Sequence, residues 1–112
     1  MLEPSRALTH GISTLVAETV AATGTDTSRP FSIIAPPGTP SKVNLAGTGT
    51  YDALAGNIEQ SNDGQTTWRT VDTFALQTTA VKVFDVYPGI SYRLNFTTVT
   101  NPVTANVLAT LT

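Results

Sequence analysis

Apolar and polar residues alternate along much of the C-terminal half of the chain. Within residues 89–99, the apolar residues Tyr92, Leu94 and Phe96 occupy every second position. The last segment, VTANVLATLT at 103–112, shows the same alternation, and KVNLAGT at 42–48 shows a shorter version of it. Because successive side chains of a strand point to opposite faces of a sheet, this period of two predicts half-buried β-strands.

Other strand-like segments follow residue 29, and turn signals separate them. They lie at 29–35, 53–61, 66–74 and 80–87. The proline-rich stretch 36–40 is expected to be a loop because proline donates no backbone hydrogen bond, and Pro88-Gly89 and Asn101-Pro102 mark further turns. About seven or eight short strands with hairpin-type turns predict an all-β fold, an antiparallel β-sandwich of the Ig-like or jelly-roll-like kind. A small closed barrel is the alternative.

The alternation also predicts which side chains fill the space between the two sheets. The predicted core consists of Phe31, Ile33, Val43, Leu45, Ile58, Trp68, Val83, Tyr92, Leu94, Phe96, Val107 and Leu111. One core of this size is what a single domain of 112 residues buries.

Residues 1–28 differ from the rest of the chain because they lack aromatic residues and a regular pattern. We therefore divide the chain into an N-terminal arm or first strand at 1–28 and a β-sandwich domain at 29–112. Residues 1–11 are expected to be extended, and TLVAETVAA at 14–22 fits a strand or a short helix. Two alternatives stay open for the whole segment: an arm that becomes ordered on a partner, or the first strand of the sandwich.

Composition argues against two classes of partner. Only 12% of the residues are charged, against about 25% in an average protein, and the net charge is −2. The basic residues are scattered singly, at Arg6, Arg29, Lys42, Arg69, Lys82 and Arg93. Nucleic acids and membrane surfaces are recognised by clustered Lys and Arg, so neither is an expected partner. The N-terminus has no signal-peptide pattern and no apolar run reaches membrane-spanning length, so synthesis in the cytoplasm is expected.

The sequence offers few groups for catalysis or for binding a metal. The chain has no cysteine, and its single histidine, His10, has no second histidine to share a metal ion or a nucleophile. Gly47-Thr48-Gly49 lacks the third glycine of a phosphate-binding loop. Glu59 and Asp72 are expected on neighbouring strands of one hairpin, where a solvated face is the simplest interpretation. We expect no cofactor, no metal and no enzymatic activity.

The octapeptide SNDGQTTW at 61–68 resembles the Asp box, a hairpin motif of sialidases and other propeller proteins. Four residues match the motif, Ser61, Asp63, Thr67 and Trp68, while Gln65 stands where the motif has glycine. The motif marks a turn and not a catalytic group, and a propeller would repeat it. We expect a structural hairpin in which Gly64 takes the left-handed conformation and Gln65 opens the next strand.

The segment from residue 54 to the C-terminus resembles small β-sandwich proteins of the virions of tailed bacteriophages and related gene-transfer particles. The matching residues are Ser61, Asp63, Gly64, Thr67 and Trp68, followed by Pro88, Gly89, Tyr92, Arg93 and Leu94. The last turn, Asn101-Pro102, departs from the pattern of those proteins. The likeness covers about half of the chain and is carried by turn and core residues.

This resemblance implies a virion structural protein of the capsid-decorating, or cement, type. Its partner would be the major capsid protein on the outer surface of the assembled shell, and a homotrimer is expected. The N-terminal segment would contact the shell through Leu2, Leu8, Ile12 and Leu15. The alternatives are a tail or head-completion subunit and a glycan-binding adhesion module, for which Tyr51 and Tyr87 are the candidate sugar-stacking residues.

Overall fold

The described part of the chain consists of β-strands joined by turns and loops. The structure is a computed structural model that describes residues 6–9, 11–17, 27–34, 41–77, 80–100 and 104–112, and no helix occurs among them. The nine strands are β1 (Arg6–Thr9), β2 (Ser13–Ala17), β3 (Phe31–Ile34), β4 (Ser41–Thr48), β5 (Ala53–Ser61), β6 (Arg69–Leu76), β7 (Lys82–Val86), β8 (Ser91–Thr100) and β9 (Asn106–Leu111).

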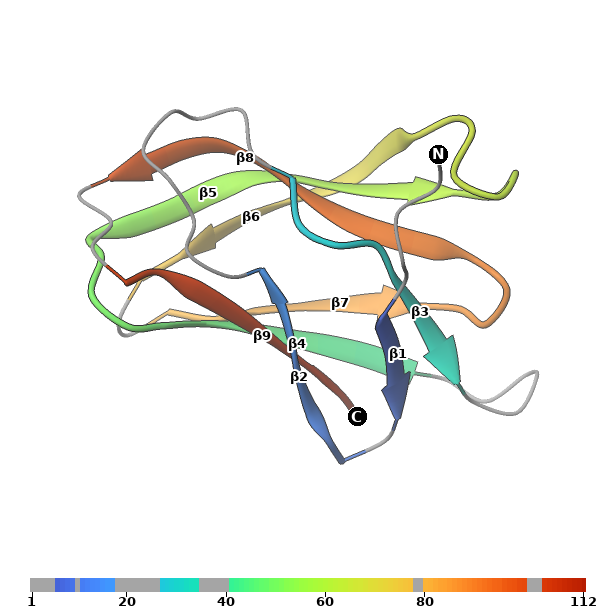
Figure 1. Cartoon of the computed structure of the whole chain (residues 1–112), viewed down its shortest axis with the longest axis horizontal. Helices are drawn as coiled ribbons and strands as arrows, with labels where there is room; N and C mark the ends of the chain where they lie inside the picture. The colour runs from blue at the N-terminus through green and yellow to red at the C-terminus, as the bar shows by residue number, and fades with distance from the viewer. Residues whose placement is uncertain (1–5, 10, 18–26, 35–40, 78–79, 101–103) are drawn as a thin grey trace.

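These strands form two sheets that pack face to face. Sheet A has the order β1-β3-β8-β5-β6 and sheet B the order β2-β9-β4-β7. In Figure 1, β5, β6 and β8 lie above β4, β7 and β9. The predicted β-sandwich is therefore confirmed. The chain has more strands than predicted because two of them come from the N-terminal segment, for which the sequence suggested at most one.

The strand order is that of a jelly roll. Counting from β2, the two four-stranded units are 2-9-4-7 and 3-8-5-6, and every pairing within them is antiparallel. This is the order produced when eight strands wrap into two facing sheets, and it selects the jelly-roll alternative over the Ig-like one. Strand β1 extends sheet A beyond this unit and pairs in parallel with β3.

The core lies between the sheets and follows the alternation seen in the sequence. In β9, and in β8 as far as Phe96, every second residue is buried. Ten of the predicted core residues are buried: Phe31, Ile33, Val43, Leu45, Ile58, Tyr92, Leu94, Phe96, Val107 and Leu111. Two predictions were wrong. Val83 is 46% exposed because β7 turns Phe84 and Val86 inward, which places Val83 on the outer face. Trp68 is half-buried and lies outside the core because it precedes β6 and packs against Arg93.

The N-terminal segment belongs to the sandwich wherever the structure describes it. Strand β1 pairs with β3 in sheet A, and β2 pairs with β9 in sheet B, so the connection between β1 and β2 crosses from one sheet to the other. Leu8, Val16 and Ala17 are buried in the shared core. Of the two alternatives for this segment, the described residues agree with strands of the sandwich. Residues 1–5, 10, 18–26, 35–40 and 101–103, which include His10, the proline-rich loop and the Asn101-Pro102 turn, lie outside the described residues.

Candidate functional site

The loop at 61–68 is held together by the side chains that the Asp-box likeness singled out. The Ser61 hydroxyl donates to the Asp63 carboxylate at 2.8 Å and accepts the backbone N–H of Gln65 at 3.0 Å. The Asp63 carboxylate also accepts the backbone N–H of Thr67 at 2.9 Å. These hydrogen bonds, that of Thr67 first and that of Ser61 next, lower the pKa of Asp63 below its usual value. Asp63 therefore serves as the anchor of a structured loop.

The backbone of this loop differs from the prediction in one respect. Gly64 does take the left-handed conformation, with φ of 70°, but Gln65 follows it with φ of 71° and is the only non-glycine residue with positive φ in the part of the chain that the structure describes. Strand β6 begins four residues later, at Arg69, so Gln65 does not open it. Gln65 stands where the Asp box has glycine, and the backbone at this position is left-handed here too. Because Gln65 has a side chain, this backbone conformation costs free energy.

Replacing this glutamine with glycine is expected to stabilise the protein. A side chain in the left-handed region costs about 1–2 kcal/mol, and the extra freedom of glycine in the unfolded chain offsets roughly half of that. We expect Gln65→Gly to raise the free energy of unfolding by about 0.5–1 kcal/mol, measured by urea denaturation. Gln60→Gly is the control. Because Gln60 lies in β5, this change should lower the free energy of unfolding. A lower free energy of unfolding in both variants contradicts the expectation for Gln65→Gly.

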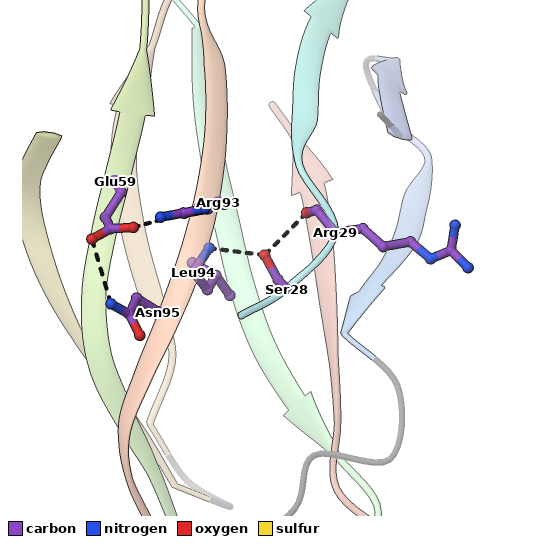
Figure 2. Close-up of polar contacts among 6 residues, drawn as sticks. All are labelled: Ser28, Arg29, Glu59, Arg93, Leu94 and Asn95. Carbon is purple, nitrogen blue, oxygen red and sulfur yellow. Dashed lines mark hydrogen bonds and ion pairs between the residues drawn. The ribbon is translucent and has the colours of Figure 1, made fainter. Parts of the chain in front are cut away.

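The outer face of sheet A carries a polar cluster formed across β5 and β8. Arg93 Nε donates to Glu59 Oε1 at 2.7 Å, and Asn95 Nδ2 donates to Glu59 Oε2 at 3.4 Å. Figure 2 shows the Glu59 carboxylate reaching both side chains of the neighbouring strand. The Arg93 guanidinium also lies 4.3 Å from the centre of the Trp68 ring, a cation–π contact. Cross-strand pairs of this kind fix the register of β5 against β8.

A buried serine, Ser28, makes hydrogen bonds to the backbone of β8 on the side of this strand that is away from β5. The Ser28 hydroxyl accepts the backbone N–H of Leu94 at 2.8 Å and donates to the carbonyl of Arg29 at 3.0 Å (Figure 2). The Ser28 N–H donates to the Leu94 carbonyl at 2.8 Å. Ser28 therefore satisfies both backbone groups of Leu94 where the regular β3–β8 ladder stops, so its burial is explained by structure.

Glu59 and Asp72 lie on neighbouring strands, as expected, but they do not face each other. Glu59 lies opposite Thr70 and points to the outer face, where it pairs with Arg93. Asp72 pairs with Lys82 of β7 at 3.1 Å and so links the edges of the two sheets. The pairing shifts register between Ile58 and Glu59, where Val71 of β6 has no partner, and this bulge in β6 separates the two carboxylates. The arrangement of two carboxylates across one sugar bond that a glycosidase uses is therefore not present in this pair.

A depression of about 240 Å³ lies beside this Asp72–Lys82 pair, between the edge strands β6 and β7. We call it the β6–β7 depression. It is lined by apolar, amide, acidic and phenolic side chains, which come from both sheets: Gln60, Val71, Asp72, Phe84, Asp85, Tyr87 and Tyr92. A second depression, of about 330 Å³, adjoins the 61–68 loop and has a polar lining: Gln60, Asn62, Asp63, Thr67 and Arg69.

The two candidate tyrosines have different surroundings. Tyr51 is buried in the core, so it cannot stack on a sugar, and this candidate was wrong. Burial also raises the pKa of its hydroxyl, which has no hydrogen-bond partner among the described residues. Tyr87 is 60% exposed at the rim of the β6–β7 depression. Its backbone N–H donates to the hydroxyl of Tyr92 at 2.9 Å, which ties the two tyrosines together.

The four residues expected to contact a partner are separated by the fold. Leu8 is fully buried and cannot contact one, which corrects its assignment. Leu15 is half-buried, Ile12 is 57% exposed, and Leu2 lies outside the described residues. The sequence analysis missed Ile34, which is 58% exposed and paired with Thr9 across β1 and β3. The Ile12 N–H donates to the Thr9 carbonyl at 3.1 Å, so both isoleucines adjoin Thr9 through the backbone, and we call this part of the surface the Ile12–Ile34 corner.

The described residues contain no group of three or more His, Cys, Asp or Glu residues able to share a metal ion. Within the same residues there is no helix of the length and apolar character needed to cross a membrane. Comparisons with protein-family models, with curated proteins and with solved structures found no match to this chain.

Proposed function

We propose that this chain is a virion structural protein, a capsid decoration (cement) protein that binds the assembled major-capsid shell and stabilises it. The observation that carries the proposal is the Ile12–Ile34 corner. Its two isoleucines are more than half exposed, yet backbone hydrogen bonds of β1, β2 and β3 hold the segments that present them. Exposed apolar side chains on a rigid frame suit a permanent contact with another protein, because little conformational entropy is lost on binding.

The charge distribution supports this choice of surface. The three strands that frame the corner, RALT, STLVA and FSII, contain a single charged residue, Arg6. The opposite side of the sandwich, formed by the edge strands β6 and β7, carries Arg69, Asp72, Lys82 and Asp85. Charged residues on an edge strand prevent it from pairing with another chain. The strands of the β1–β2–β3 side have only Arg6 for this protection, and this is the side we assign to the shell.

Fold and resemblance add a weaker kind of support. Jelly rolls occur in viral capsid domains and in lectins, although a fold alone does not determine function. The likeness to virion proteins covers about half of the chain and is carried by turn and core residues, so it supports the fold more strongly than the role. The assignment to a decoration protein, to the outer capsid surface and to a homotrimer thus belongs to the proposal. A reconstruction of the particle that contains this chain would give its position, and the position distinguishes a decoration protein from a tail or head-completion subunit.

Changing Ile34 to aspartate tests the corner directly. A carboxylate there would have to be desolvated against the shell, so we expect Ile34→Asp and Ile12→Asp each to weaken binding at least about tenfold. The measurement is co-sedimentation with assembled shells of the major capsid protein of the same virus. Val81→Asp is the matched control, because Val81 is also 58% exposed but lies next to β7.

Each outcome of this experiment decides the question. Binding by Ile34→Asp and Ile12→Asp at the wild-type level contradicts the assignment of the corner. If Val81→Asp loses as much shell binding as the corner variants do, the contact is not localised at the Ile12–Ile34 corner. Failure of the wild-type chain to sediment with the shells overturns the proposed function. Circular dichroism of each variant confirms that the sandwich is retained, as expected for exposed positions.

A further inference from the structure

We propose that the β6–β7 depression is a binding site for a neutral sugar ring, one hexose or N-acetylhexosamine unit of a glycan. This inference goes beyond the proposed function and does not depend on it, because the site lies on the β6–β7 side of the sandwich and the shell-binding corner on the β1–β2–β3 side. A volume of about 240 Å³ is suited to one monosaccharide unit. Three properties of the lining carry the proposal: a buried hydrogen-bond donor, an exposed aromatic ring and charge-balanced acceptors.

The buried donor is the hydroxyl of Tyr92. Its side chain is 1% exposed and packs between the rings of Phe31 and Phe84, each with its centre 6.0 Å away. The hydroxyl accepts the Tyr87 N–H, and none of the described residues accepts its own proton. A phenol that lines a depression and has an unused proton is available to donate to a ligand oxygen.

Burial keeps this hydroxyl in its donating form. Desolvation raises the pKa of Tyr92 above its usual value, and the hydrogen bond from Tyr87 lowers it by less. The phenol therefore stays protonated throughout the neutral pH range. Its position is rigid because the ring belongs to the core, so a ligand that accepts its proton meets a preformed site.

The aromatic surface is the ring of Tyr87. It is 60% exposed at the rim, and Val71 of β6, itself 48% exposed, lines the same depression. The C–H face of a sugar ring stacks on such a surface, while the sugar hydroxyls remain free to point to polar groups. Tyrosine suits this role because its ring is apolar and its hydroxyl is polar.

The acceptors at the rim are Gln60, Asp72 and Asp85, and the two carboxylates are balanced by lysines. Asp72 pairs with Lys82 at 3.1 Å, and Asp85 pairs with Lys42 at 3.5 Å. The local net charge is thus zero, and it does not attract an anion or a cation. Each carboxylate still has lone pairs for hydroxyl donors, since an ionised carboxylate offers about four acceptor sites. Neutral, hydroxyl-rich ligands match this combination better than peptides, which carry few donors per unit of apolar surface.

The experiment uses the full chain and defined neutral sugars. Saturation-transfer NMR with glucose, galactose, mannose and N-acetylglucosamine detects weak binding, and amide shift changes locate it. We expect at least one of these sugars to bind, with shifts confined to the surroundings of Gln60, the β6 and β7 strands and residues 87–92. Tyr87→Ala should weaken binding roughly tenfold, while Tyr87→Phe should retain most of it because the ring remains.

Two further variants separate the site from general effects on the fold. Tyr92→Phe removes the donor, together with the acceptor of the Tyr87 N–H, and should weaken binding several-fold with the sandwich intact. Val81→Ala is the control, since Val81 is exposed but does not line the depression, and it should bind like the wild type. Absence of binding to all four sugars overturns the proposal, as does equal binding by Tyr87→Ala and the wild type. An extended peptide that shifts β6 amides when no sugar does also overturns it. Shell binding should be unchanged in Tyr87→Ala, so the two proposals fail independently.

Discussion

Removing residues 1–17 will leave a chain that no longer folds cooperatively at room temperature. Although the sequence pattern allowed an arm here, β1 and β2 each complete one sheet of the sandwich. Leu8, Val16 and Ala17 are buried in the common core, and β1 covers the edge of β3. The deletion therefore exposes core side chains of both sheets at once and leaves the outer edges of β3 and β9 without partners.

The size of this effect follows from the buried side chains alone. Truncating a buried leucine costs about 2–5 kcal/mol, and the loss of a buried valine adds to it. A domain of this size has roughly 5–15 kcal/mol of stability in total, so the deletion removes most of it. Far-UV circular dichroism and urea denaturation measure the result. A truncated chain that unfolds cooperatively at the wild-type urea midpoint would contradict the role given to these strands.

Two single substitutions in β1 show whether the loss of stability comes from the removal of buried side chains or only from the shorter chain. Leu8→Ala should lower the free energy of unfolding by about 2–4 kcal/mol, because Leu8 is fully buried. Thr9→Ala, at the exposed next position of the same strand, should change it by less than about 0.5 kcal/mol. Equal effects of the two substitutions would mean that β1 contributes no side-chain packing.

The period-two alternation predicted the sandwich and most of its core, and it failed where strands lie at an edge. β8 and β9 each have a neighbouring strand on both sides. Their side chains therefore alternate between the core and the outer surface, and the hydrophobic pattern of the sequence shows this alternation. In β7, an edge strand, valines occupy both faces, so the pattern did not show that Phe84 and not Val83 faces inward. The β1–β3 pairing was also unpredictable, because it joins segments far apart in the sequence and no local signal marks it.

The candidate sites were predictable only in part, for related reasons. The residues of the 61–68 loop were found because the hydrogen bonds that hold it are local in sequence. The Ile12–Ile34 corner and the β6–β7 depression bring together residues that are separated in the sequence, so only the fold reveals them. Ile34 was missed because a residue at the end of an apolar run, FSII, has no distinguishing feature in the sequence.

Gly56 is a position at which adding one methyl group should have a large effect. It lies in β5 opposite Phe96 of β8 and Phe74 of β6, whose rings pack edge to face with centres 5.4 Å apart. A Cβ at this position would come within 2.0 Å of the Asn95 carbonyl oxygen and 3.0 Å of the Phe96 Cα. These are backbone atoms of β8, which cannot move away like the end of a flexible side chain.

We therefore expect Gly56→Ala to lower the free energy of unfolding by about 3–5 kcal/mol, more than ordinary overpacking of a core, because two central strands must separate. Gly64→Ala is the matched control. A Cβ there meets nothing within 4 Å, but φ is +70°, so only the backbone cost of about 1–2 kcal/mol applies. Urea denaturation of both variants compares the two costs. If Gly56→Ala proves no less stable than Gly64→Ala, then β5 and β8 are not packed as closely at Gly56 as the structure places them. The register that aligns Glu59 with Arg93 would then need revision as well.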